Sequence, residues 1–242
     1  MAEARAHGWW PYLGPYGLFL ILVEVQGRVP ESLEPWVFVL RVLLPGLWIL
    51  WFFRHGALRE LRGYRPGAAG LAGDVLCGVA IAALWMGPFL LFSSLPRPAP
   101  SEGFDAGIFG PGRETLALGV RLFGFAVVTP FVEELFVRSW LIRFAEVWNS
   151  RGDFRKVPIA HFTWPSFLGT TAYFVFTHQQ WEWGVMLAWT LLTMAWFYWR
   201  RHIVPLIIVH AVTNGAIFAF VLLCDERFRD GQGSPIGLWF LL

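Results

Sequence analysis

Five ionisable side chains lie deep inside apolar segments that are long enough to cross a membrane. They are Glu133, Glu134, Arg138, His178 and His210. An ionisable group in the hydrocarbon region is costly, so each of these is a candidate functional residue. Glu24, Arg41, Asp74 and Arg121 lie within about two helical turns of a predicted segment end. There a side chain can reach the headgroups or cap a helix, so a structural role is favoured for these four.

The two adjacent glutamates have different expected surroundings. Glu134 and Arg138 are four residues apart in VEELFVR, so they share a helix face and can form an ion pair in a medium of low dielectric. Glu133 points about 100° around the helix from Glu134. Glu133 is therefore the freer carboxylate and the better candidate for a general base.

Two further helices each carry a histidine at the same four-residue spacing from a partner. Phe174 and His178 share one face in FVFTH, and His210 and Asn214 share one face in HAVTN. A single histidine in a membrane more often makes a hydrogen-bonded helix contact than a catalytic site. Two histidines, two glutamates, an arginine and an asparagine on three helices instead favour one shared active site.

These motifs together resemble a known family. Glu133-Glu134-x-x-x-Arg138, Phe174-x-x-x-His178 and His210-x-x-x-Asn214, in this order on successive membrane helices, resemble the CAAX-protease and bacteriocin-processing (CPBP) family of intramembrane glutamic endopeptidases. The similarity covers roughly residues 115 to 220. The stretch from DFRKVPIAHFTWPSF through HQQW to HAVTN resembles the CAAX-protease-related branch found beside bacterial exosortase systems. No motif before about residue 110 matches.

The resemblance implies a metal-independent, cofactor-free mechanism and a role for each residue. Glu133 with His178 would polarise a water for attack on a peptide carbonyl. His210 and Asn214 would donate hydrogen bonds to the developing oxyanion. The three supporting residues would be Glu134, Arg138 and Phe174. The substrate would be a membrane-anchored protein or peptide.

Three other functions use the same residues differently. Two glutamates and two histidines could bind zinc in a membrane protease, although no His-Glu-x-x-His pair is present. The protein could be a non-catalytic membrane scaffold or chaperone, although an intact motif set favours catalysis. A proton-coupled transporter would favour short or broken helices in two matching halves, and none are visible.

Composition places the chain in the membrane class. Of the 242 residues, 56% are apolar and only 15% are charged, whereas soluble domains are about a quarter charged. The 15 tryptophans and 23 phenylalanines suit a surface that faces lipid and its interface. A net charge of +2 from dispersed residues excludes a nucleic-acid partner. Cys77 and Cys224 lie in or beside apolar runs and indicate no disulfide framework.

Apolar runs predict an all-α transmembrane bundle of about seven or eight helices, which forms one integral domain over residues 1 to 242. The runs fall near 9 to 27, 36 to 53, 69 to 93, 116 to 147, 160 to 178, 183 to 199 and 203 to 223, which gives seven crossings. The fourth run should kink or divide at Pro130. Ile236 to Leu242 is too short to cross and should lie in the interface or against the bundle.

The positions of basic residues predict the orientation. Arginine and lysine are concentrated in the connections after the second, fourth and sixth runs, including Arg143 in the second of these groups. These loops should be cytoplasmic, as should the N-terminus, which carries no removable signal peptide. The expected location is the bacterial inner membrane. One difficulty is that straight spans would put His178 near the outer end of its helix and His210 near the inner end of its own.

Overall fold

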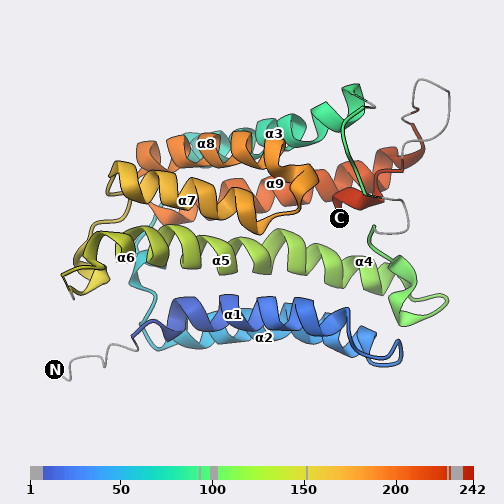
Figure 1. The fold of residues 1–242 in the computed structure, drawn as a ribbon, viewed down its shortest axis with the longest axis horizontal. Coiled ribbons are helices and arrows are strands. Elements are labelled where there is room, and N and C mark those ends of the chain that lie inside the picture. Colours follow the sequence, from blue (N-terminus) through green and yellow to red (C-terminus); the bar gives the residue numbers. More distant parts are fainter. Residues whose placement is uncertain (1–7, 93, 99–102, 151, 228, 230–236) are drawn as a thin grey trace.

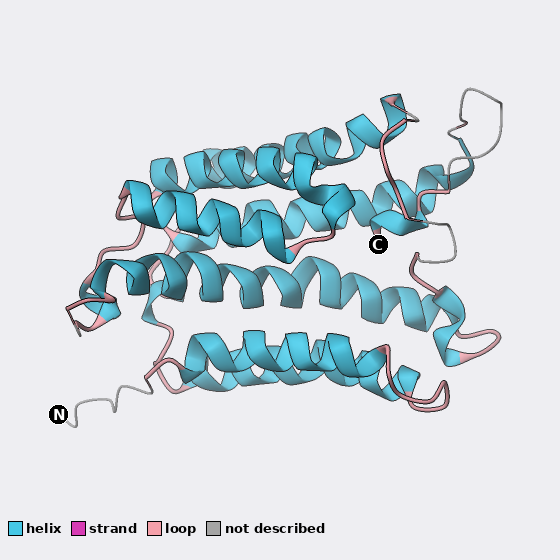
Figure 2. Ribbon diagram, in the orientation of Figure 1, coloured by secondary structure: helices cyan, strands magenta, loops and turns pink. Residues whose placement is uncertain are grey.

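The computed structural model describes residues 8–92, 94–98, 103–150, 152–227, 229 and 237–242. Regular structure in these residues is helical throughout (Figure 2). The helices are α1 Trp10–Gln26, α2 Glu34–Arg54, α3 Ala68–Leu91, α4 Glu114–Phe123, α5 Thr129–Glu134, α6 Ile142–Val147, α7 Trp164–Thr177, α8 Trp183–Arg200 and α9 Ile203–Cys224. The all-helical fold that the apolar runs predict is confirmed.

One long helix runs through the middle of the molecule. α4, α5 and α6 are joined by two π-helical segments, Gly124–Val128 and Leu135–Leu141, into a continuous helix from Glu114 to Val147, named here the central helix. The α1–α2 hairpin packs on one side of it, and α3, α7, α8 and α9 pack on the other (Figure 1). The central helix therefore contacts both layers and can carry residues into a site between them.

The outer surface suits a lipid environment. Large apolar side chains are exposed on several helices, such as Leu76 and Leu223, both 69% exposed. In the described part of the chain, four segments are long and apolar enough to cross a membrane: Glu34–Arg54, Ala68–Leu91, Glu114–Val147 and Ile203–Cys224. An integral membrane protein explains this surface, because water would penalise it. That the remaining helices also cross stays a prediction.

Of the two outcomes predicted at Pro130, a kink or a division, the division is wrong. The helix continues because Pro130 follows the π-helical segment Gly124–Val128, where the Thr129 N–H bonds to the Gly124 carbonyl five residues earlier. In the same five-residue pattern, the Phe125 carbonyl would accept a hydrogen bond from the backbone N–H of residue 130. Residue 130 is a proline and has no N–H. The helix thus accommodates Pro130 by forming a wider turn before it. The Phe125 carbonyl is left to accept a hydrogen bond from another group.

α7 is shorter than its apolar run. It begins at Trp164, after Thr163, whose hydroxyl accepts the Ser166 N–H, and it ends at Thr177. Its 14 residues span about 21 Å, less than a bilayer core of about 30 Å. The connection from His178 to Glu182 therefore returns early, alongside the middle part of the longer helices.

Two largely buried ion pairs lie at one end of the bundle, where α3 begins and where the central helix and α8 end. Arg143, placed in a loop by the charge pattern, instead lies buried in α6, and its Nη2 is 3.2 Å from the Glu60 carboxylate. That interpretation of Arg143 is wrong because the helix extends past it and Glu60 supplies the countercharge. Asp74 is fully buried in α3, and its Oδ2 lies 3.0 Å from Arg200 Nη2.

Candidate active site

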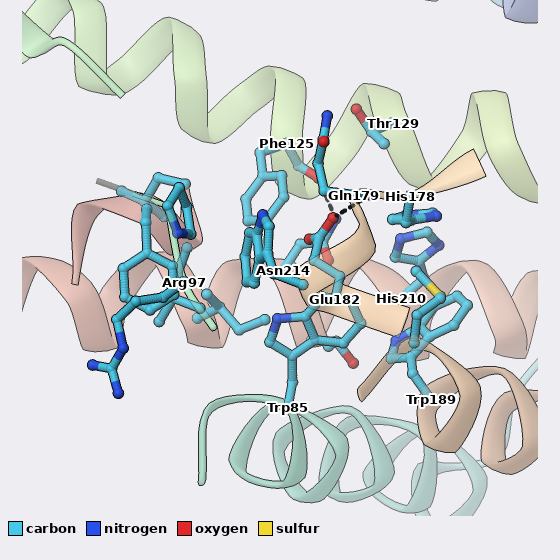
Figure 3. Close-up of a pocket in the computed structure, with 18 of the residues that line it drawn as sticks. Trp85, Arg97, Phe125, Thr129, His178, Gln179, Glu182, Trp189, His210 and Asn214 are labelled. Atoms are coloured by element: carbon cyan, nitrogen blue, oxygen red, sulfur yellow. Dashed lines mark hydrogen bonds between the residues drawn. The ribbon is translucent and has the colours of Figure 1, made fainter. Parts of the chain in front are cut away.

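A cavity of about 520 Å³ lies between the central helix, α9 and the α7–α8 connection. Four of the predicted site residues line it: Glu133, His178, His210 and Asn214. The three expected supporting residues, Glu134, Arg138 and Phe174, are completely or almost completely buried. Figure 3 shows His178 and Glu182 of the α7–α8 connection facing the same cavity as His210 and Asn214 of α9. The structure therefore brings the predicted set together in one place.

Behind the cavity wall lies a buried ion pair. Arg138 Nη1 is 3.1 Å from Glu134 Oε1, and both side chains are fully buried. Arg138 Nη2 also donates to Thr193 Oγ1 at 3.0 Å, and the guanidinium carbon lies 3.8 Å from the centre of the Phe174 ring. The spacing correctly predicts this ion pair. Phe174 covers its arginine with an aromatic face, which stabilises a desolvated cation.

His210 is attached to the same carboxylate. Its Nδ1 lies 2.8 Å from Glu134 Oε1, and its Nε2 lies 3.9 Å from Glu133 Oε2. An ionised carboxylate only accepts hydrogen bonds, so Nδ1 carries a proton. The edge of the His210 ring faces Trp189, with 4.8 Å between ring centres. Glu134 therefore orients His210 as well as Arg138, a contact that the sequence did not reveal.

Glu133 is the accessible one of the two glutamates. Its side chain is 16% exposed and lines the cavity, whereas that of Glu134 is completely buried. The difference follows from the rotation of about 100° between consecutive helical residues. A carboxylate in this position can meet a water or a substrate that enters the cavity.

His178 terminates α7. Its Nδ1 lies 2.7 Å from the Phe174 carbonyl, which can only accept, so Nδ1 carries the proton and Nε2 is the basic nitrogen. The carbonyl of His178 accepts the Trp183 Nε1–H at 3.1 Å. Because α7 ends early, His178 reaches the same cavity as His210. The short helix thus removes the difference in depth that straight spans would impose.

Asn214 is fixed by the central helix. Its Nδ2 donates to the Phe125 carbonyl at 2.7 Å. This is the carbonyl whose π-type partner would be the missing N–H of Pro130. Proline and the π turn together therefore provide an acceptor that orients the Asn214 amide, and the second amide hydrogen is left for another acceptor.

Sequence reasoning found Glu133 but missed three cavity residues on the central helix that align with it. Arg121, Phe125, Thr129 and Glu133 are spaced four apart, and all four line the cavity. In a regular α-helix each four-residue step would rotate the side chain by about 40°. The wider π turn at Gly124–Val128 offsets this rotation. Spacing by four is visible in the sequence, but the π turn that aligns the stripe is not.

Glu182 also lines the cavity and was not predicted. It accepts the Gln179 N–H through Oε2 at 3.0 Å, which rigidifies the α7–α8 connection. Burial raises the pKa of Glu182, as does the neighbouring Glu133, whereas His178 and the Gln179 N–H lower it. Glu182 therefore adds a second carboxyl group near His178.

A candidate metal centre is not evident in the described segments. No group of three or more His, Cys, Asp or Glu side chains in them is placed to hold a metal ion.

Comparison with known protein families supports the resemblance drawn from the motifs. Residues 115–216 match the family model described as type II CAAX prenyl endopeptidase Rce1-like. No curated protein and no solved structure gives a match. The matched segment begins at the start of the central helix and ends just after Asn214, so it contains all seven predicted site residues. Residues 115–216 are therefore similar to the Rce1-like type II CAAX prenyl endopeptidases, in agreement with the CPBP resemblance of the motifs.

Proposed function

We propose that the protein is an intramembrane endopeptidase that hydrolyses a peptide bond of a membrane-anchored protein or peptide with a glutamate-activated water. The observation that carries this is the cavity shared by Glu133, His178, His210 and Asn214. A carboxylate, a basic imidazole nitrogen and two hydrogen-bond donors in one enclosed space are the groups that peptide hydrolysis requires.

In the proposed mechanism, Glu133 and Nε2 of His178 hold a water against the substrate carbonyl. Glu133 takes one proton as the water oxygen forms a bond to the carbonyl carbon. The resulting tetrahedral intermediate collapses with cleavage of the C–N bond, and the leaving amine receives the proton from Glu133. The carboxylate is thus restored at the end of the cycle.

Asn214 and His210 would stabilise the oxyanion. The second N–H of the Asn214 amide is free to donate, because the first is bonded to Phe125. His210 already donates from Nδ1 to Glu134, so it can donate from Nε2 only as an imidazolium. The proposal therefore requires a His210 that donates from both ring nitrogens in the transition state, with Nδ1 on the Glu134 carboxylate.

The setting of the reaction belongs to the same proposal. We place the protein in the bacterial inner membrane with its N-terminus in the cytoplasm, on the basis of the Arg-rich connections that the charge pattern predicts to be cytoplasmic. Assignment to the branch found beside exosortase systems, and a single domain over residues 1–242, also stay predictions.

Hydrolysis of membrane-anchored peptides by the purified full chain tests the function. Glu133→Gln should abolish cleavage with the fold intact, because it removes only the basic oxygen. Glu31→Gln is the matched control, since Glu31 is an exposed glutamate that does not line the cavity, and this variant should cleave normally. Activity should survive strong chelators. Normal cleavage by Glu133→Gln, or loss with chelator and recovery with zinc, would refute the proposed chemistry.

A further inference from the structure

A second cavity, of about 610 Å³, lies between α2, the central helix and α9. It is named here the α2–α9 groove, and every residue that lines it is apolar, including Leu43, Leu50, Phe131 and Ile208. None of its lining residues lines the first cavity. All three helices belong to the segments that are long and apolar enough to cross a membrane. The groove is therefore a separate feature of the membrane-spanning part of the molecule.

The groove forms because α2 and α9 both pack against the central helix but little against each other. Between them, Phe123, Val127 and Val128 of the central helix line the groove. Leu47 and Leu50 of α2 and Val127 are also exposed at the surface, so the groove is open along one side. In a bilayer this side faces lipid, and an unfilled groove would lose the dispersion contacts of its lining. An apolar chain in the groove restores those contacts.

The length of the groove corresponds to one leaflet of a bilayer. Its lining residues on α2 extend from Val42 to Phe53, which is about 16 Å along the helix axis. The hydrocarbon core of a bilayer is about 30 Å thick, so each leaflet contributes about 15 Å. One acyl chain of a single leaflet would therefore fill the groove from end to end.

Two arginines lie at one end of the groove. Leu47, Leu50 and Arg54 share one face of α2, so Arg54 lies one turn beyond a lining residue. Arg62 donates from Nη2 to the Phe53 carbonyl, and its guanidinium carbon lies 5.0 Å from the centre of the Phe53 ring, which lines the groove. Both arginine side chains are exposed. They can therefore contact a group that lies at the end of the groove.

Acidic side chains do not neutralise this end of the groove. In the described part of the chain, neither arginine forms an ion pair with an Asp or Glu side chain. Glu60, the acidic residue between them in the sequence, instead pairs with Arg143 at 3.2 Å. A guanidinium can donate two parallel hydrogen bonds to a phosphate, and basic pockets between membrane helices bind anionic headgroups. The charge at this end is therefore complementary to a phospholipid headgroup.

We propose that the α2–α9 groove binds one acyl chain of an anionic phospholipid, whose phosphate accepts hydrogen bonds from Arg54 and Arg62. An apolar groove as long as one leaflet, with guanidinium groups at one end, matches both parts of such a lipid. The leaflet is the one that the Arg-rich connections predict to be cytoplasmic. This site goes beyond the proposed function and does not depend on it, because the groove is separate from the candidate active site.

Competition between two lipids tests the site. The full chain is purified in a neutral detergent and mixed with equal amounts of dioleoyl phosphatidylglycerol, which is anionic, and dioleoyl phosphatidylcholine, which has no net charge. Native mass spectrometry then measures how much of each lipid the chain retains. The anionic lipid should bind roughly 30-fold more tightly, because each arginine near a lipid headgroup contributes a factor of about five.

Removal of the two charges should remove the preference. Arg54→Gln combined with Arg62→Gln should bind both lipids about equally, with binding of phosphatidylcholine unchanged. Arg28→Gln combined with Arg113→Gln is the matched control, because it removes two exposed arginines that precede α2 and the central helix. This control should keep the preference. Equal binding of the two lipids by the wild type, or equal loss of preference in both double variants, would overturn the proposal.

A substitution in the groove tests the position of the acyl chain. Leu50→Trp enlarges a lining residue and should weaken binding of both lipids about tenfold, the effect of removing roughly two methylene groups from apolar contact. Leu40→Trp is the control on the same helix, since Leu40 does not line the groove and is 42% exposed, against 41% for Leu50. Unchanged binding by Leu50→Trp would place the lipid elsewhere and overturn the proposal.

Two other occupants of the groove give different results in the same measurement. A second copy of the chain would appear as dimers in place of lipid complexes. An isoprenyl chain would be indicated if an equal amount of an uncharged isoprenoid alcohol displaced the phosphatidylglycerol. Either result would overturn the assignment to an anionic phospholipid. Peptide cleavage does not enter this experiment, so failure of the proposed function would leave the lipid result standing.

Discussion

Two parts of the same cavity differ in how their charged side chains are paired. At the inner wall, defined as Glu134, Arg138 and His210, each charged group has a partner within the protein, at 3.1 Å for the ion pair and 2.8 Å for the imidazole. At the other end, Arg121 donates to the main-chain oxygen of Leu242, and no Asp or Glu side chain among the described residues forms an ion pair with it. Both cations lie on the central helix and both contact aromatic rings.

This difference in charge pairing indicates different roles for the two parts of the cavity. A buried charge with a matched partner is satisfied before any ligand arrives, and its removal leaves the partner uncompensated. A charge without such a partner gains most of its stabilisation from what enters the cavity. The inner wall should therefore affect stability and chemistry, and Arg121 should affect binding.

The largest effect on folding is expected at Glu134. Glu134→Gln leaves Arg138 buried without a countercharge and should destabilise the protein by about 3–5 kcal/mol. Thermal unfolding in detergent measures this, with Glu31→Gln as the control. Glu134→Gln combined with Arg138→Met should recover much of the loss, because no unpaired charge then remains. An unchanged melting temperature for Glu134→Gln would mean that the pair is hydrated.

The largest effect on turnover after loss of Glu133 is expected at Asn214. Asn214→Ala should lower kcat by roughly 10²- to 10³-fold with much less change in KM, because the donor acts mainly on the transition state. His210→Ala should behave likewise, and the double variant should be little worse than either single one if the pair acts as a unit. Single-turnover kinetics measures this. Weaker binding with unchanged chemistry would make the α9 motif a recognition feature.

The helices and the motif residues were accessible from the sequence because their signals are local. Apolar runs of bilayer length fixed the order of seven helices, and four-residue spacing put Glu134 beside Arg138. The early end of α7 was not accessible, since it depends on the His178–Glu182 connection and its contacts with other elements.

Arg121 shows a different limit. Its place near a segment end favoured a structural role. Its alignment with Glu133 was not predicted, because that alignment depends on the π turn at Gly124–Val128. The occupation of the cavity by Phe240–Leu242 depends on contacts with α3 and the α7–α8 connection. Such long-range contacts leave no periodic signal in one sequence.

A smaller effect is expected at the start of α9, the helix that carries His210 and Asn214. His202 Nδ1 accepts the Val204 N–H at 3.2 Å and caps this helix. Burial lowers the pKa of His202, and Glu60 opposes this. The native state therefore disfavours the proton, so the stability that this group contributes is present above its unfolded pKa of about 6.5 and is lost as pH falls through the folded value.

The cap is worth about 1 kcal/mol. His202→Asn retains a side-chain acceptor that does not titrate near neutral pH, so its stability should fall less than that of the wild type between about pH 7.5 and 5.5. Thermal unfolding of the two proteins across this range measures the difference, in which the other histidines cancel. Parallel pH profiles would show that the cap is not coupled to protonation.

The smallest effect on stability is expected at Arg121, and it tests the comparison directly. Arg121→Met removes a desolvated cation together with its hydrogen bond to Leu242 and its contacts with Phe104 and Phe125. These losses and gains nearly cancel, because an apolar replacement avoids the cost of burying the charge, so stability should change by less than about 1 kcal/mol. Arg138→Met, the same substitution at the inner wall, leaves Glu134 without its ion pair and should cost about 3 kcal/mol or more. Thermal unfolding of both variants in the same detergent compares their losses of stability. If Arg121→Met destabilises the protein as much as Arg138→Met, Arg121 is a structural group. The contrast between the two parts of the cavity then fails.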